Sequence, residues 1–101
     1  MDVNVDAARV RDCLAGDPRA FAALVEQYEK PVYNVALRML RNPEDARDIA
    51  QTVFLKAWQN LSSYDPRYKF YSWIYRMAIN ESLNVLRSRG RGDEPVDERL
   101  P

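Results

Sequence analysis

The sequence contains no histidine and only one cysteine, Cys13. Histidine is the commonest general base and a frequent metal ligand, so its absence argues against an acid-base enzyme and against a metal site. Neither a glycine-rich phosphate loop nor a cysteine cluster is present, and acids such as Glu44 and Asp45 are explained by the electrostatics of a helix N-terminus. We therefore expect no enzyme activity, no metal and no cofactor, with Cys13 as a small buried side chain.

Long hydrophobic runs are missing as well. No eighteen apolar residues follow one another, and the first twenty residues hold no continuous apolar run. We therefore expect neither a membrane span nor a signal peptide, and a cytoplasmic protein. The 101 residues, 47% apolar and 30% charged, suffice for one compact domain with a modest core.

The formal net charge is zero, but the charges are unevenly distributed. Residues 1–61 carry eight Lys or Arg against nine Asp or Glu, residues 62–92 carry six against two, and residues 93–101 carry one against four. The middle segment is therefore basic, and a local excess of positive charge attracts polyanions because salt confines the field to about 10 Å at 0.1 M. Nucleic acid is a candidate partner; on charge alone, a solvated basic face is the alternative.

Aromatic residues are concentrated in the same basic segment. The twelve residues at positions 64–75, YDPRYKFYSWIY, hold six of the eleven aromatic side chains, interleaved with Arg67 and Lys69. Aromatic rings beside cations suit single-stranded nucleic acid better than a duplex, because a duplex hides the faces of its bases. An extruded base that stacks on an aromatic ring gains about 1–3 kcal/mol.

The spacing of apolar residues predicts helices and no strand. The first helix covers residues 5–14. The second runs from Pro18 to about residue 41, with Asp17 as its N-cap. Pro31 lies inside this second helix and is expected to kink or divide it.

Asn42 and Pro43 repeat the same start signal and begin a third helix, which is expected to end near residue 61. The run SSYDPRYK is predicted to be a loop, and the fourth helix covers about residues 70–88. The rest is rich in glycine, proline and charge. We therefore predict one all-α domain, a compact bundle of about four helices at residues 1–91, followed by a linker or tail at residues 92–101.

The predicted fourth helix has two different faces at 100° per residue. One is a core stripe, made of Ile74, Ala78, Ile79, Ser82, Leu83, Val85 and Leu86. The opposite face forms what we call the recognition stripe: Trp73, Arg76, Asn80, Asn84 and Arg87. Arginine can clamp phosphate or guanine, asparagine can pair with a base edge, and an indole can stack on an unpaired base. The pattern does not decide whether Trp73 belongs to the core instead.

The loop before this helix completes a predicted strand-binding site. Several cations are expected to follow the phosphate backbone: Arg67, Lys69, Arg76, Arg87, Arg89 and Arg91. Four rings are expected to wall a pocket for bases pulled from the stack: Tyr64, Tyr68, Phe70 and Tyr71. The sequence leaves open whether Phe70 and Tyr75 lie in the core.

Two runs carry a resemblance to a known family. The third helix contains DARDIAQTVFLKAWQNL, and the fourth contains FYSWIYRMAINESLNVLRSR. Together, over about residues 17–91, they resemble region 2 of the extracytoplasmic-function sigma factors, the small bacterial transcription-initiation subunits. The most specific residues are Asp45, Ala46, Asp48, Gln51, Phe54, Phe70, Trp73, Tyr75, Arg76, Ala78 and Asn80.

The resemblance implies two partners. The third helix would bind core RNA polymerase by docking on the coiled-coil clamp of the β′ subunit, through Asp45, Asp48, Gln51, Thr52 and Leu55. The loop and the fourth helix would melt the minus-ten promoter element and capture a flipped base of the single-stranded non-template strand. In that process Asn80 would read the base together with the loop, and the strand contacts would be Arg76, Asn84 and Arg87.

Three features bear on this resemblance. The usual second domain, a helix-turn-helix that reads the minus-thirty-five element, is missing from this sequence. Arg47 and Thr52 stand where acids are common in the clamp-binding helix. Since some relatives with a depleted acidic helix are switched by a threonine kinase, we hypothesise that Thr52 is a phosphorylation site. The family often has an anti-sigma partner, which is the other route of control. The alternative function is a helical protein-interaction module that does not bind DNA.

Overall fold

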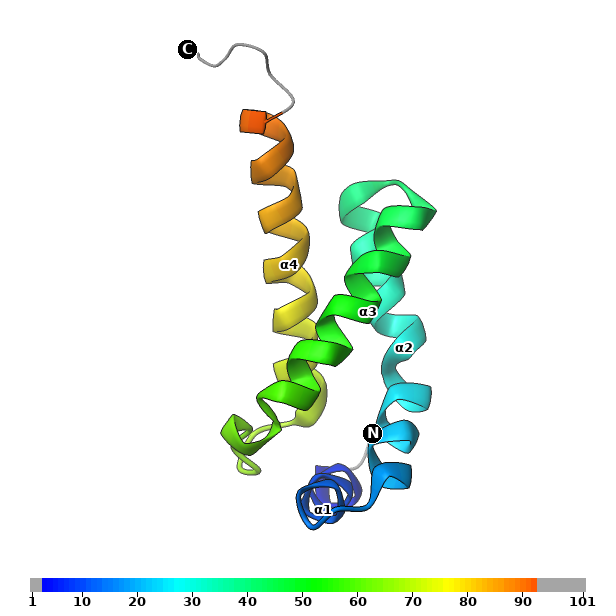
Figure 1. Cartoon of the computed structure of the whole chain (residues 1–101), viewed down its shortest axis with the longest axis vertical. Helices are drawn as coiled ribbons and strands as arrows, with labels where there is room; N and C mark the ends of the chain where they lie inside the picture. Colours follow the sequence, from blue (N-terminus) through cyan, green and yellow to red (C-terminus); the bar gives the residue numbers. More distant parts are fainter. Residues whose placement is uncertain (1–2, 93–101) are drawn as a thin grey trace.

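The computed structural model describes residues 3–92. This part of the chain forms four α-helices and one 3-10 helix: α1 (Val3–Leu14), α2 (Pro18–Leu40), α3 (Pro43–Gln59), η1 (Leu61–Ser63) and α4 (Phe70–Gly92). Helix α2 packs against α1, α3 and α4, and α3 also packs against α4. Figure 1 shows α1 lying across the lower end of the other three helices. The predicted all-α bundle of four helices is confirmed.

Two helices begin where their capping residues predict. The Asp17 side chain accepts a hydrogen bond from the backbone N–H of Arg19 at 3.0 Å, and Pro18 follows as the first helical residue. The Asn42 side chain likewise accepts from the N–H groups of Glu44 and Asp45, at 2.9 and 3.0 Å. Such caps satisfy N–H groups that have no partner within the helix, so these starts are fixed by local chemistry.

The predicted helix ends are less accurate. Helix α3 ends at Gln59, earlier than expected, where the Asn60 side chain donates to the carbonyl of Lys56 at 2.9 Å. Helix α2 continues through Pro31, so the proline does not divide it. Helix α1 begins two residues earlier than predicted, at Val3.

The fourth helix is longer than predicted. It continues past residue 88 to Gly92, with Gly90 inside it. A single glycine costs a helix only about 1 kcal/mol relative to alanine, and the surrounding arginines are good helix formers. The helix therefore includes residue 92, where the predicted linker or tail begins, and residues 93–101 lie outside the part of the chain that the structure describes.

The core lies between α2, α3 and the first half of α4. Its largest fully buried side chains are Tyr28 and Phe70, and each helix adds small apolar residues: Val10, Leu24, Val32, Ala36, Ala46, Val53, Ala57, Ile74 and Ala78. Cys13 is also buried, as predicted, and burial is the main cause that raises the pKa of its thiol. Among the described helices, none is long and apolar enough to cross a membrane.

Helix α1 is joined to this core by a buried polar contact. The carboxyl of Asp6 is 2% exposed and accepts a hydrogen bond from the hydroxyl of Tyr28 in α2. Burial, followed by the interaction with Asp6, raises the pKa of Tyr28. A buried carboxylate without a partner is costly, so this contact fixes where α1 docks.

The core stripe predicted on α4 is only partly buried. Ile74, Ala78 and Ser82 are buried, and Ile79, Leu83 and Val85 are half-buried. Leu86, which was predicted to be core, is 39% exposed. Figure 1 shows the end of α4 reaching above the α2–α3 connection, so the helix extends beyond the core.

Candidate nucleic-acid interface

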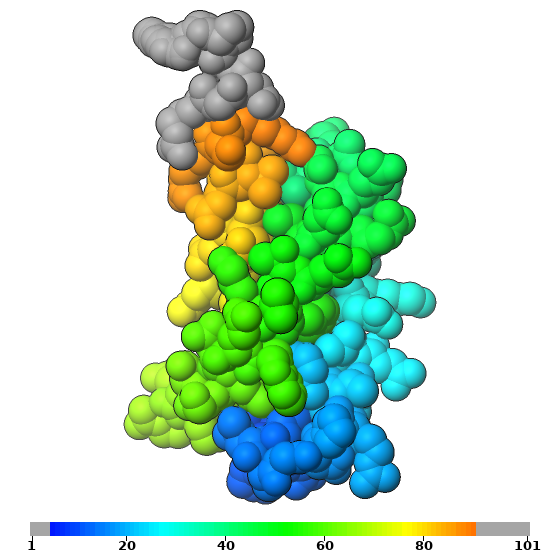
Figure 2. All heavy atoms as spheres, in the orientation of Figure 1, coloured from blue at the N-terminus to red at the C-terminus, as the bar shows by residue number. Residues whose placement is uncertain are grey.

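A pocket of about 460 Å³ lies between the loop after η1 and the first turns of α4. Its lining residues are Ser63, Tyr64, Asp65, Tyr68, Ser72, Trp73 and Arg76. Figure 2 shows this loop, in yellow-green, protruding at the lower edge of the molecule beside α1 in blue. The pocket therefore opens on the basic and aromatic segment that the sequence singled out.

Two of the rings that line the pocket, Tyr64 and Trp73, pack against the core ring of Phe70. The ring of Tyr64 lies 5.4 Å from that of Phe70 and 5.4 Å from that of Trp73, measured between centroids. Phe70 and Trp73 are 5.6 Å apart. Trp73 is half-buried and lines the pocket, so it combines the two roles that the sequence left open. This aromatic cluster holds the pocket floor in place before any ligand arrives.

The loop over the pocket is held by its own polar contacts. The Tyr64 hydroxyl donates to the carbonyl of Tyr68. Asp65 accepts from the backbone N–H of Arg67 at 2.9 Å and from its guanidinium at 2.7 Å, and the side-chain hydrogen bond is the main cause that lowers the pKa of Asp65. The ring of Tyr68 is 64% exposed and lies 5.9 Å from the Arg67 guanidinium. The loop therefore presents a ring to solvent while part of the Arg67 charge is already compensated.

Two of the four predicted pocket rings lie elsewhere. Phe70 is 1% exposed and is a core residue. Tyr71 packs against Tyr28 and Tyr75, at centroid distances of 5.7 and 5.2 Å, and does not line the pocket. Both rings contact Tyr28 of α2. The local sequence around Phe70 and Tyr71 could not predict that this ring lies beside them. Tyr75 is half-buried, and Lys69 is exposed at the start of α4.

Sequence reasoning missed three polar residues of the pocket, Ser63, Asp65 and Ser72. Ser72 lies one helical turn before Arg76, so the helical wheel could have placed it beside the pocket. The run Asp65-Pro66-Arg67 is typical of a turn in which the aspartate bonds the backbone two residues on, which could have predicted the loop geometry.

The recognition stripe continues from the pocket along α4. Arg76 lines the pocket, and Asn80 is exposed one turn further on. Asn84 and Arg87 are also exposed, and the Arg87 guanidinium donates to the Asn84 side chain at 2.8 Å. Among the described residues, neither Arg76 nor Arg87 pairs with an acid. The geometry therefore joins a ring-floored pocket to a helix face that carries amides and cations without an acidic partner among the described residues.

The outer face of α3 carries the residues that the resemblance assigned to polymerase. Asp48, Gln51 and Leu55 are exposed, Leu55 by 57%. Asp45 and Thr52 are half-buried, so they are less accessible to a partner than Asp48. The reason is that α4 packs along this side of α3.

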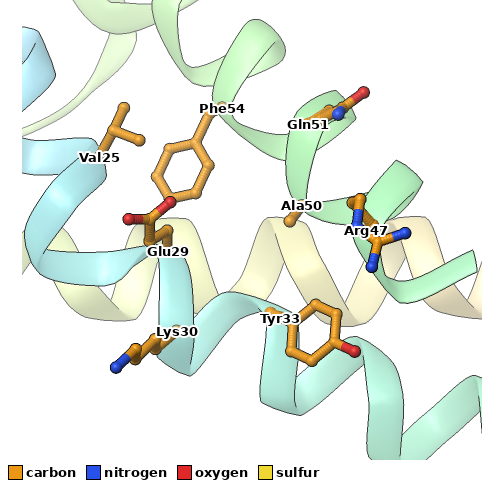
Figure 3. Close-up of a pocket in the computed structure, with 8 residues that line it drawn as sticks. All are labelled: Val25, Glu29, Lys30, Tyr33, Arg47, Ala50, Gln51 and Phe54. Atoms are coloured by element: carbon orange, nitrogen blue, oxygen red, sulfur yellow. The ribbon is translucent and has the colours of Figure 1, made fainter. Parts of the chain in front are cut away.

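A second hollow, of about 580 Å³, lies between α2 and α3. Figure 3 shows Val25 and Phe54 at one end and Tyr33 and Arg47 at the other. The remaining lining residues are Glu29, Lys30, Ala50 and Gln51. Gln51 belongs both to this groove and to the exposed face of α3. The groove therefore borders the predicted polymerase face. No local pattern predicts it, because its apolar residues follow ordinary core spacing.

Comparisons with known proteins agree with this geometry. Residues 24–92 match the Sigma-70 region 2 family. The ECF RNA polymerase sigma factor SigW of Bacillus subtilis is 38% identical over 81 residues, which cover 80% of this chain and 43% of that protein. The ECF RNA polymerase sigma-E factor of Escherichia coli is 35% identical over 86 residues, which cover 85% of this chain and 44% of that protein. The chain spans less than half the length of these relatives.

A solved structure resembles the fold over most of its length. It is the NMR structure of an engineered region 2 of sigmaE in complex with GTAAAA, with a TM-score of 0.78 and 37% sequence identity. The match covers 88% of this chain and 93% of that chain. The two chains therefore share one fold over most of their length.

Proposed function

Because the chain belongs to the Sigma-70 region 2 family, as an extracytoplasmic-function member, we propose that it binds core RNA polymerase and recognises and melts the minus-ten promoter element. The observation that carries the DNA-binding part is the ring-floored pocket that opens directly onto the recognition stripe. A pocket suits one unstacked base, and the stripe suits the strand on either side of it. The related sigmaE domain, in complex with GTAAAA, supports this assignment.

Each side chain of the interface has a distinct proposed role. The rings of Tyr68 and Trp73 stack on bases, and Tyr64 supports Trp73 from below. Arg76, Arg87 and Lys69 contact phosphates, with a smaller contribution from Arg67 because Asp65 already binds it. Asn80 reads the edge of the captured base, and Asn84 contacts the strand. Phe70 and Tyr71 act through packing alone.

The polymerase-binding part rests on α3. We propose that Asp48, Gln51 and Leu55 dock on the β′ clamp coiled coil, because an exposed acid, an amide and an apolar side chain lie together on this face. Asp45 and Thr52 lie at its edge toward α4. An exposed leucine between polar groups is typical of an interface that excludes water around one apolar contact.

Control and location follow from the same assignment. We propose that the protein works in the cytoplasm, where polymerase and promoter DNA meet, and that it regulates transcription without catalysing a reaction. The groove beside Gln51 favours a further protein contact, and an anti-sigma factor is the candidate partner. A protein-interaction module without DNA binding remains the second candidate, and the same groove is the observation that favours it.

Base-specific binding tests the proposed function. The domain is titrated with the single strand GTAAAA and with strands in which each position is changed in turn. Asn80→Ala should flatten the preference at one position, since pairing with a base edge is worth about 1–3 kcal/mol. Arg87→Ala should weaken all strands by a similar factor, because a phosphate contact carries no sequence information.

The matched control is Asn84→Ala, which removes the same side chain one turn further along α4. It should not change the preference at the position that Asn80 reads. If Asn80→Ala weakened every strand by the same factor, the base-reading role would be wrong. If the wild-type domain bound none of the strands, the protein-interaction module would be the better description.

A further inference from the structure

Asp45 is not free in the structure. It lies in the first turn of α3, and its carboxylate forms an ion pair with the guanidinium of Arg89, near the end of α4. The two side chains are 29% and 39% exposed, so the pair is partly shielded from water. A carboxylate that already holds a guanidinium attracts a second cation less strongly.

Asp48, the other acid that the family resemblance assigns to polymerase binding, has no such partner in the described part of the chain. It is exposed, and it forms no ion pair with any residue among those described. The ion pair between α3 and α4 therefore compensates the charge of Asp45 and leaves that of Asp48 uncompensated by the described residues. The difference does not follow from their spacing along α3, because it depends on α4.

The part of α4 that carries Arg89 is weakly packed. No residue from Leu83 to Gly90 is buried, and Leu86 is exposed. A second ion pair, Lys56–Glu81 at 2.6 Å, holds α4 to α3 lower down. Moving the Arg89 side chain away from Asp45 would therefore disturb little of the core.

We propose that Arg89 masks Asp45 in the free domain and that polymerase displaces it on binding. This inference rests on the proposed function, since it concerns the same α3 face. Polymerase cations and the Arg89 guanidinium compete for one carboxylate. The contact is autoinhibitory: it lowers polymerase affinity without touching Asp48, Gln51 or Leu55, and it couples the end of α4 to events on α3.

The competition predicts an unusual pattern of variants. Arg89→Gln removes the competing charge and should tighten binding to core polymerase by roughly two- to fivefold, the range expected for a partly exposed ion pair. Asp45→Asn should weaken binding. The double variant should bind as Asp45→Asn does, because Arg89 acts only through Asp45. Arg89→Lys, which keeps the charge, should stay close to the wild type.

Two controls separate the masking of Asp45 from an effect of net charge and from a loss of stability. Arg11→Gln removes one positive charge from an exposed position on α1 and should leave polymerase affinity unchanged. Urea unfolding of each variant should show that Arg89→Gln is folded and slightly less stable than the wild type. A variant that is less stable yet binds polymerase more tightly cannot be explained by a purely structural role for Arg89.

The decisive measurement is the Kd for core RNA polymerase at one low salt concentration. Tighter binding of Arg89→Gln, cancelled by Asp45→Asn, supports the mask. Equal or weaker binding of Arg89→Gln overturns it and makes the ion pair a structural contact only. If the wild type does not bind polymerase at all, the proposed function itself fails, which is a separate outcome.

Discussion

The two halves of α4 are held in place by different interactions. The first half rests on buried groups, with Phe70 at 1% exposure and Ile74 and Ala78 fully buried. The second half has no buried residue between Ser82 and Gly90. Two ion pairs join it to α3, Lys56–Glu81 at the midpoint of α4 and Arg89–Asp45 near its end. Apolar packing is short-ranged and hard to rearrange, whereas a partly exposed ion pair exchanges partners at little cost.

This difference matches the tasks proposed for the two halves. A pocket for one base needs rings in fixed positions, because a stacking contact is lost when the rings move apart. Strand contacts and polymerase contacts tolerate adjustment, because charges act over a longer range and carry no base preference. The most specific function is therefore placed on the most rigid packing.

We expect the largest effect on stability from a substitution in the first half of α4, which rests on buried groups. Phe70→Ala removes a buried ring that contacts Tyr28, Tyr64 and Trp73, and should lower the free energy of unfolding by about 3–5 kcal/mol. Urea unfolding measures it. The matched control is Tyr68→Ala, which removes an exposed ring from the same segment. It should leave stability nearly unchanged and weaken single-strand binding; a large loss of stability in Tyr68→Ala would contradict the division between core and ligand rings.

The next effect concerns the hydrogen bond that joins α1 to α2. Tyr28→Phe removes the hydroxyl that binds the buried Asp6, and should cost about 1–3 kcal/mol of unfolding free energy at pH 7. Tyr68→Phe, which removes an exposed hydroxyl, is the control. Equal stability of both variants would mean that water replaces the lost donor and that α1 is not fixed by this contact.

The same contact predicts how the free energy of unfolding depends on pH in the alkaline range. Burial, and then Asp6, raises the pKa of Tyr28 above the ordinary tyrosine value of about 10. A group with a raised pKa contributes its full stability below that ordinary value and loses the contribution as the pH rises through the folded-state pKa. Wild-type stability should therefore fall above about pH 10, and the fall should be smaller in Tyr28→Phe. The prediction would be wrong if the free energy of unfolding depended on pH in the same way in the wild type and in Tyr28→Phe.

How far the sequence predicts this molecule depends on the range of the interactions. The starts of α2 and α3 are predictable because Asp17 and Asn42 act within three residues of themselves. The end of α4 is not, because one glycine is a weak stop when good helix formers flank it. Leu86 has core spacing but is 39% exposed, because no residue of α4 from Leu83 to Gly90 is buried.

The candidate site divides in the same way. The exposure of Arg76, Asn80 and Asn84 follows from helical periodicity alone. The aromatic residues could not be sorted, because Phe70 and Tyr71 are buried or covered by a tyrosine from another helix. The Asp45–Arg89 pair joins residues 44 positions apart, and no local pattern points to it.

We expect the smallest effect from a change of charge at Thr52, beside the polymerase face of α3. Thr52 is half-buried on α3, one turn before Lys56. Phosphorylation would add about −1.5 to −2 charges beside the polymerase face. Thr52→Glu should therefore tighten polymerase binding modestly while Thr52→Ala stays at the wild-type level, and the gain should shrink as salt rises. Equal binding of all three proteins, with transcription unaffected by a threonine kinase, would exclude the switch.

The proposed function requires that the preformed pocket beside Trp73 captures a base from a single strand. Trp58→Phe leaves Trp73 as the one tryptophan of the chain, so its fluorescence reports the pocket. This variant is titrated with single-stranded DNA containing GTAAAA and with the matching duplex, at one fixed salt concentration. We predict that the single strand changes Trp73 fluorescence at clearly lower concentrations than the duplex. Equal binding curves for the two forms would contradict the account.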